Sequence, residues 1–343
     1  MSSSASEVLP RGLWREAAGA IPNSLALGYA VAGYVAGFFL MASGSALLNV
    51  AGVLLTAHAM VIAAYLIHEA AHYTLFARPA HNLLAGELMN FIAGSAYVSF
   101  ERIRHLHLRH HRDRADVTCF DYKAFLKRRP RLTKLVHALE WAHVPAIEII
   151  MHLQVIVRPF VEPGQRRHRR RVATVLSVRV ALLAAIALIS PQAVLLYFVA
   201  YGLLLATLNF FDAFHHTFDQ YFVDADTPVP MNGRDRAFEQ ANTYSNVLSA
   251  RWPVLNLLTL NFGYHNAHHE RAAVPWYRLP ALHRELFADS PRELMALPEL
   301  LRTFHRNRLR RVLDDDYGYV GAPGAGRADT FIGAHGVSFL TVV

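Results

Sequence analysis

Histidines in three short clusters are the residues of this sequence whose type and spacing point most directly to chemistry. The clusters read His68-Glu69-Ala70-Ala71-His72, His107-Leu108-Arg109-His110-His111 and His265-Asn266-Ala267-His268-His269. The first places histidines at positions i and i+4, and the other two place them at i, i+3 and i+4. These spacings put the imidazole rings on one face of a helix. Because imidazole binds iron, zinc, copper and nickel, the clusters predict a metal site.

The three clusters together contain more histidines than one metal ion binds. A structural zinc takes four ligands, and a catalytic zinc takes three and a water, so we expect two metal ions. The string Asp212-Ala213-Phe214-His215-His216-Thr217 adds a further candidate. Asp212 and His216 stand at i and i+4, so we expect His216 to bind a metal and Asp212 to bind a metal-bound water or orient a ligand. We expect His215 and His105 to point away from the metals.

The composition indicates that these clusters belong to a membrane protein. Hydrophobic residues make up 53% of the 343 residues and charged residues only 17%, whereas soluble domains carry about 25% charged residues. A membrane-spanning helix needs about 20 apolar residues. We predict four spans, at about residues 24–42, 46–67, 172–189 and 192–211. The turns within the two resulting hairpins are too short to hold a domain.

The distribution of Lys and Arg predicts the orientation of these spans. The turns Ser43-Gly44-Ser45 and Ser190-Pro191-Gln192 contain neither residue, whereas the segment between the hairpins includes Lys127-Arg128-Arg129 and Arg166-Arg167. Basic loops stay on the cytoplasmic side of a membrane. We therefore expect both termini and all three histidine clusters on that side.

The remaining segments complete the predicted domain organisation. Residues 88–100 and 141–160 are apolar but too short or too polar to span, and we expect them to form helices at the membrane interface. Residues 1–23 would form a cytosolic N-terminal segment without a cleavable signal peptide. Residues 24–320 would form the membrane domain, and the Gly-rich chain from residue 321 to residue 343 a flexible tail.

Charge and cysteine content exclude several other classes of protein. The net charge of +8 is typical of a surface that faces anionic lipids. No nucleic-acid-binding motif is visible, so we expect no nucleic-acid partner. The single cysteine, Cys119, excludes a disulfide framework and a Cys-ligated zinc or iron–sulfur site.

Two other functions remain open at this point. His68, Glu69 and His72 match the zinc-protease pattern H-E-x-x-H, in which the Glu is the general base, and Asp212 would then be the third metal ligand. That reading leaves both H-x-x-H-H clusters unexplained. A metal-handling transporter is the second alternative. Transport predicts polar residues deep in the spans, whereas the histidine clusters gather at one end and His58 is interpreted as a satisfied interior residue.

As a set, the histidine clusters resemble those of the membrane fatty acid desaturase and hydroxylase superfamily. The resemblance rests on the order HEAAH, HLRHH and HNAHH, on HHT after the last span, and on the segments HEAAHYTLF and NFGYHNAHH followed by VPWYRLP. It covers roughly residues 45–285. It implies an all-α integral membrane fold, in which four transmembrane helices lie beneath a cytosolic helical cap that carries a His-rich di-metal site.

The resemblance also implies the metal and its ligands. Two iron ions would be held by His68, His72, His107, His110, His111, His216, His265, His268 and His269. Some relatives carry Asn at the position of Asp212, so the substitution of Asp here puts a water-mediated Asn contact in doubt.

The implied activity is an O2-dependent oxidation of an unactivated C–H bond in a fatty acyl chain. We predict that a double bond is introduced, and hydroxylation on the same scaffold is the alternative. The acyl group would be carried by CoA, by acyl carrier protein or by a lipid. The sequence contains no fused electron-transfer domain, so a ferredoxin, rubredoxin or cytochrome b5-type donor is implied.

Residues near the clusters have two possible roles each. Three acidic residues either accept hydrogen bonds from the metal ligands or balance the charge of a basic loop: Asp113, Asp116 and Asp121. Four arginines either face lipid head groups or steer an acidic head group: Arg102, Arg104, Arg109 and Arg112. Three aromatic residues either line the substrate entrance or anchor the protein at the membrane surface: Trp252, Trp276 and Tyr277.

Overall fold

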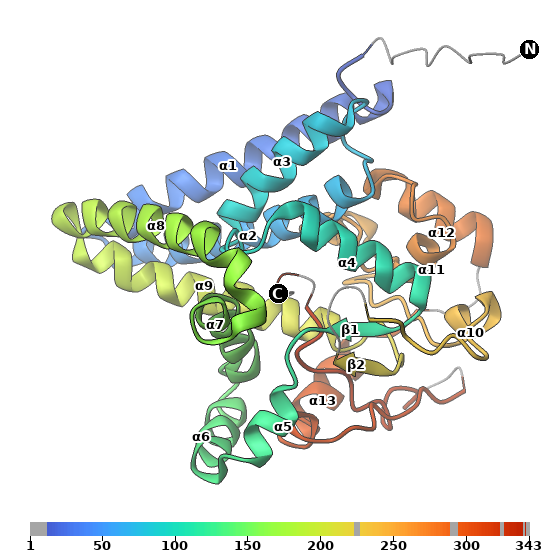
Figure 1. Cartoon of the computed structure of the whole chain (residues 1–343). Helices are drawn as coiled ribbons and strands as arrows, with labels where there is room; N and C mark the ends of the chain where they lie inside the picture. The colour runs from blue at the N-terminus through green and yellow to red at the C-terminus, as the bar shows by residue number, and fades with distance from the viewer. Residues whose placement is uncertain (1–11, 223–226, 289–293, 323–325, 339, 341–343) are drawn as a thin grey trace, which may run out of the picture.

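The structure is a computed structural model that describes residues 12–222, 227–288, 294–322, 326–338 and 340. The chain is mostly helical (Figure 1). Its described strands are β1 (Asp116–Thr118) and β2 (Gln220–Phe222), which pair in parallel with Asp116 opposite Gln220. Residues 1–11 of the predicted N-terminal segment lie outside the described residues.

Four long helices confirm the predicted spans. They are α1 (Ala20–Met41), α2 (Ala46–Ala71), α8 (Arg169–Ile189) and α9 (Pro191–Asp212), and each is long and apolar enough to cross a membrane. Helix α1 packs along α2, α8 packs against α9, and α9 also contacts α2. The close approach of α1 and α2 depends on Gly52, where a Cβ atom would lie 2.8 Å from the backbone nitrogen of Met41.

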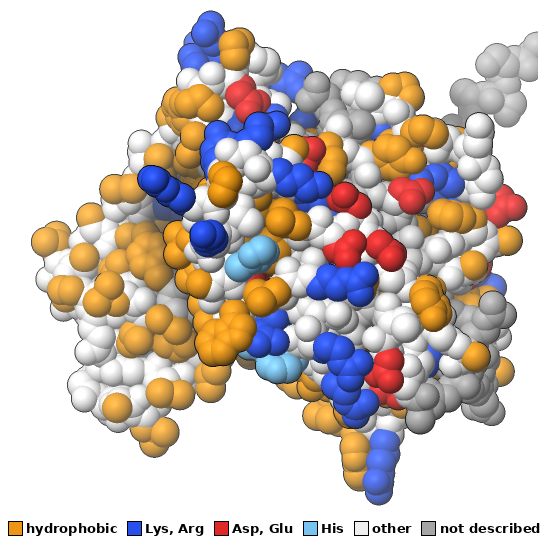
Figure 2. Space-filling model, turned by 90° about the horizontal axis from the view of Figure 1, so that it is seen from below, with side chains coloured by type: hydrophobic (Ala, Val, Ile, Leu, Met, Phe, Trp, Pro, Cys, Tyr) orange, Lys and Arg blue, Asp and Glu red, His pale blue; other side chains and the backbone are white. Residues whose placement is uncertain are grey.

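The exposed surface of these helices is apolar at the ends farthest from the histidines. Leu188 is 90% exposed, Ile189 86% and Leu47 78%. Figure 2 shows hydrophobic side chains gathered over the part of the molecule that the long helices form, whereas Lys, Arg, Asp and Glu lie mainly over the rest. An apolar surface of this extent requires a lipid environment, so the chain is a membrane protein.

The other helices gather mainly around one end of the four long helices (Figure 1). Those between the two hairpins are α3 (Pro79–Ile92), α4 (Phe100–Asp113), α5 (Tyr122–Lys127), α6 (Pro130–Trp141) and α7 (Ala146–Val161). Those after the second hairpin are α10 (Arg236–Ala241), α11 (His265–Glu270), α12 (Leu279–Phe287) and α13 (Leu297–Arg306). Short 3-10 helices are η1 (Ala17–Gly19), η2 (Pro163–His168), η3 (Pro253–Thr259), η4 (Trp276–Arg278) and η5 (Arg310–Val312).

Two predicted helices have different boundaries in the structure. Over residues 88–100, α3 ends at Ile92 and the chain turns at Gly94, whose φ is +88°, before Ser99 caps the start of α4. The prediction of a single helix there is wrong, because the glycine allows a left-handed turn that hydrophobicity does not reveal. Over residues 141–160, α6 ends at Trp141 and α7 begins only at Ala146.

The segment after residue 320 differs from the loose tail that its composition predicted. Ala328, Phe331 and Ile332 are buried. The ring of Phe331 packs edge-on against Phe214, with ring centroids 5.2 Å apart. The backbone N–H of Ala334 donates to the carbonyl of Ala213 at 2.9 Å. Residues 326–338 are therefore part of the folded core beside the end of α9.

Candidate metal centre

Four elements bring the predicted ligands together. Helix α2 ends at Ala71, so His68 lies in its last turn and His72 is its C-cap residue. Helix α4 carries the second cluster, and Ser99 fixes its start by accepting a hydrogen bond from the N–H of Arg102 at 3.3 Å. The third cluster opens the short helix α11. His216 lies just beyond α9, which ends at Asp212.

Five of the predicted ligands form one cluster, which we call the five-histidine group: His68, His72, His107, His111 and His268. The Nε2 atoms of His72 and His107 are 2.7 Å apart, and those of His107 and His111 are 3.2 Å apart. The Nε2 atom of His268 is 3.0 Å from that of His68 and 3.1 Å from that of His111. The rings therefore direct their Nε2 atoms at a common point.

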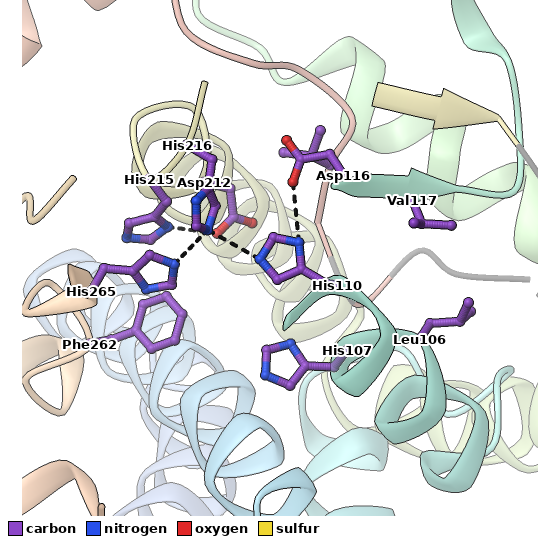
Figure 3. A pocket seen from close by; sticks show the side chains of 11 residues that line it. Leu106, His107, His110, Asp116, Val117, Asp212, His215, His216, Phe262 and His265 are labelled. Carbon is purple, nitrogen blue, oxygen red and sulfur yellow. Dashed lines mark hydrogen bonds and ion pairs between the residues drawn. The ribbon is translucent and has the colours of Figure 1, made fainter. Parts of the chain in front are cut away.

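The other four predicted ligands form the four-histidine group: His110, His216, His265 and His269. The Nε2 atom of His216 is 2.8 Å from that of His265 and 3.1 Å from that of His110 (Figure 3). Each H-x-x-H-H cluster contributes to both groups. Its first and last histidines, at i and i+4, share one group, and the middle histidine belongs to the other.

The hydrogen bonds of His110 and His216 test whether these rings fit a metal ion. The Nδ1 atom of His110 lies 3.0 Å from the carbonyl of Ala115, which can only accept, so this nitrogen carries the proton. The Nδ1 atom of His216 lies 3.2 Å from the hydroxyl of Thr243, whose own proton goes to the carbonyl of Glu239. With the proton on Nδ1, each ring directs an Nε2 lone pair at the other, and these lone pairs repel. A cation held between the two nitrogens, either a metal ion or a proton, removes this conflict.

The distances within both groups are also those of metal ligands. An imidazole nitrogen lies about 2.0–2.1 Å from a bound metal such as zinc. Two such nitrogens at right angles around one ion are therefore about 3 Å apart, and the Nε2 pairs given above lie at 2.7–3.2 Å. The residues present thus fit two metal ions, one in each group.

For most of the predicted ligands, the electrostatic environment favours the neutral ring that metal binding requires. Burial, followed by repulsion between neighbouring rings, lowers the pKa of most ligands well below the usual range: His72, His107, His111, His216, His265, His268 and His269. For His110, burial lowers the pKa, but the hydrogen bond and charge of Asp116 outweigh this effect and raise it.

Hydrogen-bond partners on the far side of the rings fix their orientation. Glu239 accepts from Nδ1 of His269 at 2.9 Å and also pairs with Arg114. Asp116 lies 3.4 Å from Nδ1 of His110. Asp116 was one of three acidic candidates named for their position close to the second cluster, with charge balance as the alternative role. Glu239 was not, because a distance of thirty residues along the chain leaves no local pattern that would identify it.

The other acidic and basic candidates have different partners. Asp113 pairs with Arg109 at 2.6 Å and with Arg112 at 2.7 Å. Asp121 caps helix α5 by accepting from the N–H of Ala124. Among the described contacts, neither acidic residue touches a metal ligand, so their roles are charge pairing and helix capping.

His105 and His215 lie outside both groups. His105 is exposed. The ring of His215 stacks on that of His265, with centroids 4.0 Å apart, but its Nε2 atom bonds to the side-chain oxygen of Asn246 at 3.0 Å. Asp212 lies near His215, with 3.8 Å between Oδ1 and Nδ1. The α9 helix ends at Asp212, so the predicted helical i, i+4 relation between Asp212 and His216 does not hold.

A small cavity of about 70 Å³ adjoins the four-histidine group (Figure 3). Its walls come from α4, β1, the end of α9, the loop before α11 and the C-terminal segment. They include polar Asp116 and Asp212 together with apolar Leu106, Val117 and Phe262. The cavity therefore places an apolar surface directly beside the rings.

Glu69 is placed unfavourably for a zinc-protease base. Its Oε2 atom accepts from the hydroxyl of Thr74 at 2.6 Å and from the backbone N–H of Trp276 at 3.1 Å. Its Oε1 atom lies 3.5 Å from Nδ1 of His68, the nitrogen opposite the one directed into the five-histidine group. The carboxylate thus supports the ring from behind and does not face a metal-bound water.

Comparison with known proteins agrees with this geometry. No curated protein is significantly similar to the chain. The sequence model of the family described as fatty acid desaturase matches residues 43–299, which include every histidine of both groups. The match covers three of the four long helices in full and nearly all of the elements that surround the rings. The chain therefore belongs to the fatty acid desaturase family.

Proposed function

We propose that the protein uses two iron ions and O2 to oxidise an unactivated C–H bond in a fatty acyl chain. The observation that carries the proposal is the convergence of the histidine rings into two groups, in a membrane protein of the fatty acid desaturase family. The five-histidine group would hold one iron and the four-histidine group the other. Asp212, which lines the adjoining cavity, would hold a metal-bound water.

Bound iron would supply the activation of O2 and the removal of hydrogen from carbon. The protein itself would position the acyl chain and exclude water from the site. Phe262 packs against His68 and His265, with centroids 4.7 Å and 5.0 Å apart. With Leu106 and Val117 it makes one side of the cavity apolar, so an acyl carbon can approach the ligands along that side.

A second, larger cavity offers a path for the acyl chain. It measures about 450 Å³ and lies between α1, α2 and the segment 257–261, with Trp276 and Tyr277 in its wall. Leu260 and Asn261 line this cavity, and the next residue, Phe262, lines the cavity at the metal centre. We propose that the acyl chain enters beside Trp276, whose indole N–H donates a hydrogen bond to Asn23. Trp252 is 59% exposed and suits a membrane anchor.

Two competing functions have less support. The position of Glu69 behind His68 disfavours a zinc protease. A metal transporter would need polar groups available along the spans, but His58 is bonded to the hydroxyl of Tyr29 at 2.6 Å and to the carbonyl of Leu258 at 3.0 Å. His58 therefore links α1, α2 and η3 at the wall of the larger cavity.

The cellular arrangement is part of the proposal. The basic segment between the hairpins favours a cytoplasmic position for the metal centre and for both termini. The acyl substrate would be linked to CoA, acyl carrier protein or lipid, and a ferredoxin, rubredoxin or cytochrome b5-type protein would supply electrons.

The first experiment is mass spectrometry of cellular lipids and added acyl substrates after expression with an electron donor. Loss of two hydrogens from the product identifies desaturation, and gain of one oxygen identifies hydroxylation. Products identical to those of cells without the protein would contradict the proposal.

Two substitutions test the metal centre itself. His268→Ala removes a ligand from the five-histidine group, and His110→Ala removes one from the four-histidine group. Each variant is expected to lose turnover and bound iron while still inserting into the membrane. His105→Ala is the matched control because His105 is exposed. Wild-type iron content and activity in either ligand variant would refute the assignment.

A further inference from the structure

The C-terminal segment reaches the metal centre although it lies outside the matched family region. The family match ends at residue 299, yet Val337 lines the cavity beside His110, His216 and His265. Among the described residues, this segment contributes one side chain to a wall that otherwise comes from the ligand-bearing elements and their neighbours. It is therefore positioned to act on whatever occupies the cavity.

Several contacts hold the segment in place before Val337. The N–H of Gly333 donates to the carbonyl of Tyr317 at 3.0 Å, and the N–H of Ala334 donates to the carbonyl of Ala213. Gly333 has a φ of +86°, and a Cβ atom there would lie 2.8 Å from the carbonyl oxygen of Ala213. The close approach to the end of α9 thus depends on glycine.

Buried titratable side chains surround the next two residues. His335 is 1% exposed and lies between two carboxylates, with Nε2 3.6 Å from Glu140 and Nδ1 3.9 Å from Glu148. The N–H of Gly336 donates to Oε1 of Glu148 at 3.1 Å. Gly336 has a φ of +67°, and a Cβ atom there would lie 2.8 Å from the ring of Tyr122. The backbone is thus fixed directly before Val337.

Ser338, directly after Val337, is buried. It lies close to Asp212, which lines the same cavity. Val337 therefore lies between Gly336, whose N–H is bonded to Glu148, and the buried Ser338.

The size of the cavity makes one side chain important. It measures about 70 Å³, whereas ligand pockets commonly measure about 300–1,000 Å³. Such a space admits only the reacting part of an acyl chain. A change of one or two methyl groups at Val337 is a large fraction of that space.

We propose that Val337 is a specificity-determining residue, which limits how far the acyl chain advances past the metal centre and thereby selects the carbon that is oxidised. The proposal rests on the proposed function. It assigns a role in substrate selection to a segment beyond the family match.

Three substitutions test this proposal. The variants are compared with the wild type only if they bind the same amount of iron. Val337→Ala enlarges the cavity, Val337→Ile fills part of it, and Val320→Ala is the control. Val320 belongs to the same C-terminal segment but packs against the apolar cluster that contains Phe214 and Phe331, and it does not line the cavity. Acyl substrates of graded chain length are supplied, and the oxidised position is read by mass spectrometry of the products.

One methylene in an apolar pocket changes selectivity by about tenfold or more. We expect Val337→Ala to change the ratio of products oxidised at neighbouring carbons by at least about tenfold, and Val337→Ile to change it in the opposite direction. The chain-length preference of substrate binding, measured without O2, should shift in the same direction as the product ratio. Val320→Ala should match the wild type.

The outcomes separate this inference from the proposed function. A wild-type protein that oxidises no acyl substrate contradicts the proposed function. A wild type that oxidises substrate, together with Val337 variants whose product ratios equal those of Val320→Ala, overturns the inference alone. If Val337→Ala does not fold, Val337→Ile decides the question by the same ratio.

Discussion

Glu239 offers the most direct test of how the protein prepares its metal centre. Its two carboxylate oxygens are shared between a ring and a guanidinium, at 2.9 Å from Nδ1 of His269 and 2.9 Å from Nε of Arg114. The side chain is buried, with 6% exposure for the residue. Glu239→Gln keeps the shape but removes the negative charge that fixes the ring and increases its basicity.

The expected loss follows from the bond to His269. A hydrogen bond to a charged group contributes about 1.5–3 kcal/mol, and about 1.4 kcal/mol corresponds to a tenfold change in affinity. Glu239→Gln should therefore weaken metal binding at the four-histidine group by about 10–100-fold, which is the range found for residues that support metal ligands. The five-histidine group, which does not include His269, should retain its metal.

The assay is iron content per protein after equilibration with a graded series of chelator concentrations. Glu285→Gln is the matched control, because it breaks a pair with Arg271 in which both side chains are at least half exposed, and exposed pairs contribute little. The wild type and the control should lose iron at the same chelator concentration. Loss of half the iron from Glu239→Gln at a lower concentration is expected, and a curve identical to the wild type would refute the reasoning.

Two other substitutions give further predictions. Glu69→Gln should lower iron affinity or turnover without abolishing oxidation, because Glu69 supports His68 from behind; complete loss of a hydrolytic activity would instead identify a zinc protease. Burial, followed by the charge of Arg179, lowers the pKa of His152 to about 4, so the unfolded chain binds a proton between about pH 6.5 and 4 that the folded protein does not. On acidification over this range, the wild type should therefore lose about 1 kcal/mol more stability per pH unit than His152→Gln. This difference is measured as a steeper fall of Tm with falling pH in the wild type. Parallel curves of Tm against pH for the two proteins would contradict this prediction.

The sequence was most informative where a long pattern determined the structure. An apolar run of about 20 residues has few alternatives to a membrane helix, and all four spans were predicted within a few residues. The ends were less accurate because the helices continue into polar sequence, as α2 does to Ala71. The histidine spacing identified the rings that converge, but the expectation that each cluster presents its rings on one face did not reveal how they divide between two groups.

Features that depend on contacts between distant residues were not predictable. The composition of the segment after residue 320 suggested a loose tail, but Gly333 and Gly336 use positive φ angles to approach Ala213 and Tyr122 closely. Glycine permits either disorder or close packing, and composition alone does not distinguish them. The support of His269 by Glu239 likewise depends on how α10 and α11 pack.

The way each H-x-x-H-H cluster divides between the groups explains why this spacing suits two metals. Successive residues of a helix are about 100° apart around its axis, so residues at i and i+4 differ by about 40°, whereas i+3 and i+4 differ by about 100°. His107 and His111 therefore point in nearly the same direction and share the five-histidine group, while His110 turns toward the other group. In the third cluster the same rule assigns the i and i+4 pair to the four-histidine group and the middle ring, His268, to the five-histidine group. Two such helices facing each other would supply both proposed sites at once, and a single metal ion would leave part of each cluster outside its set of ligands.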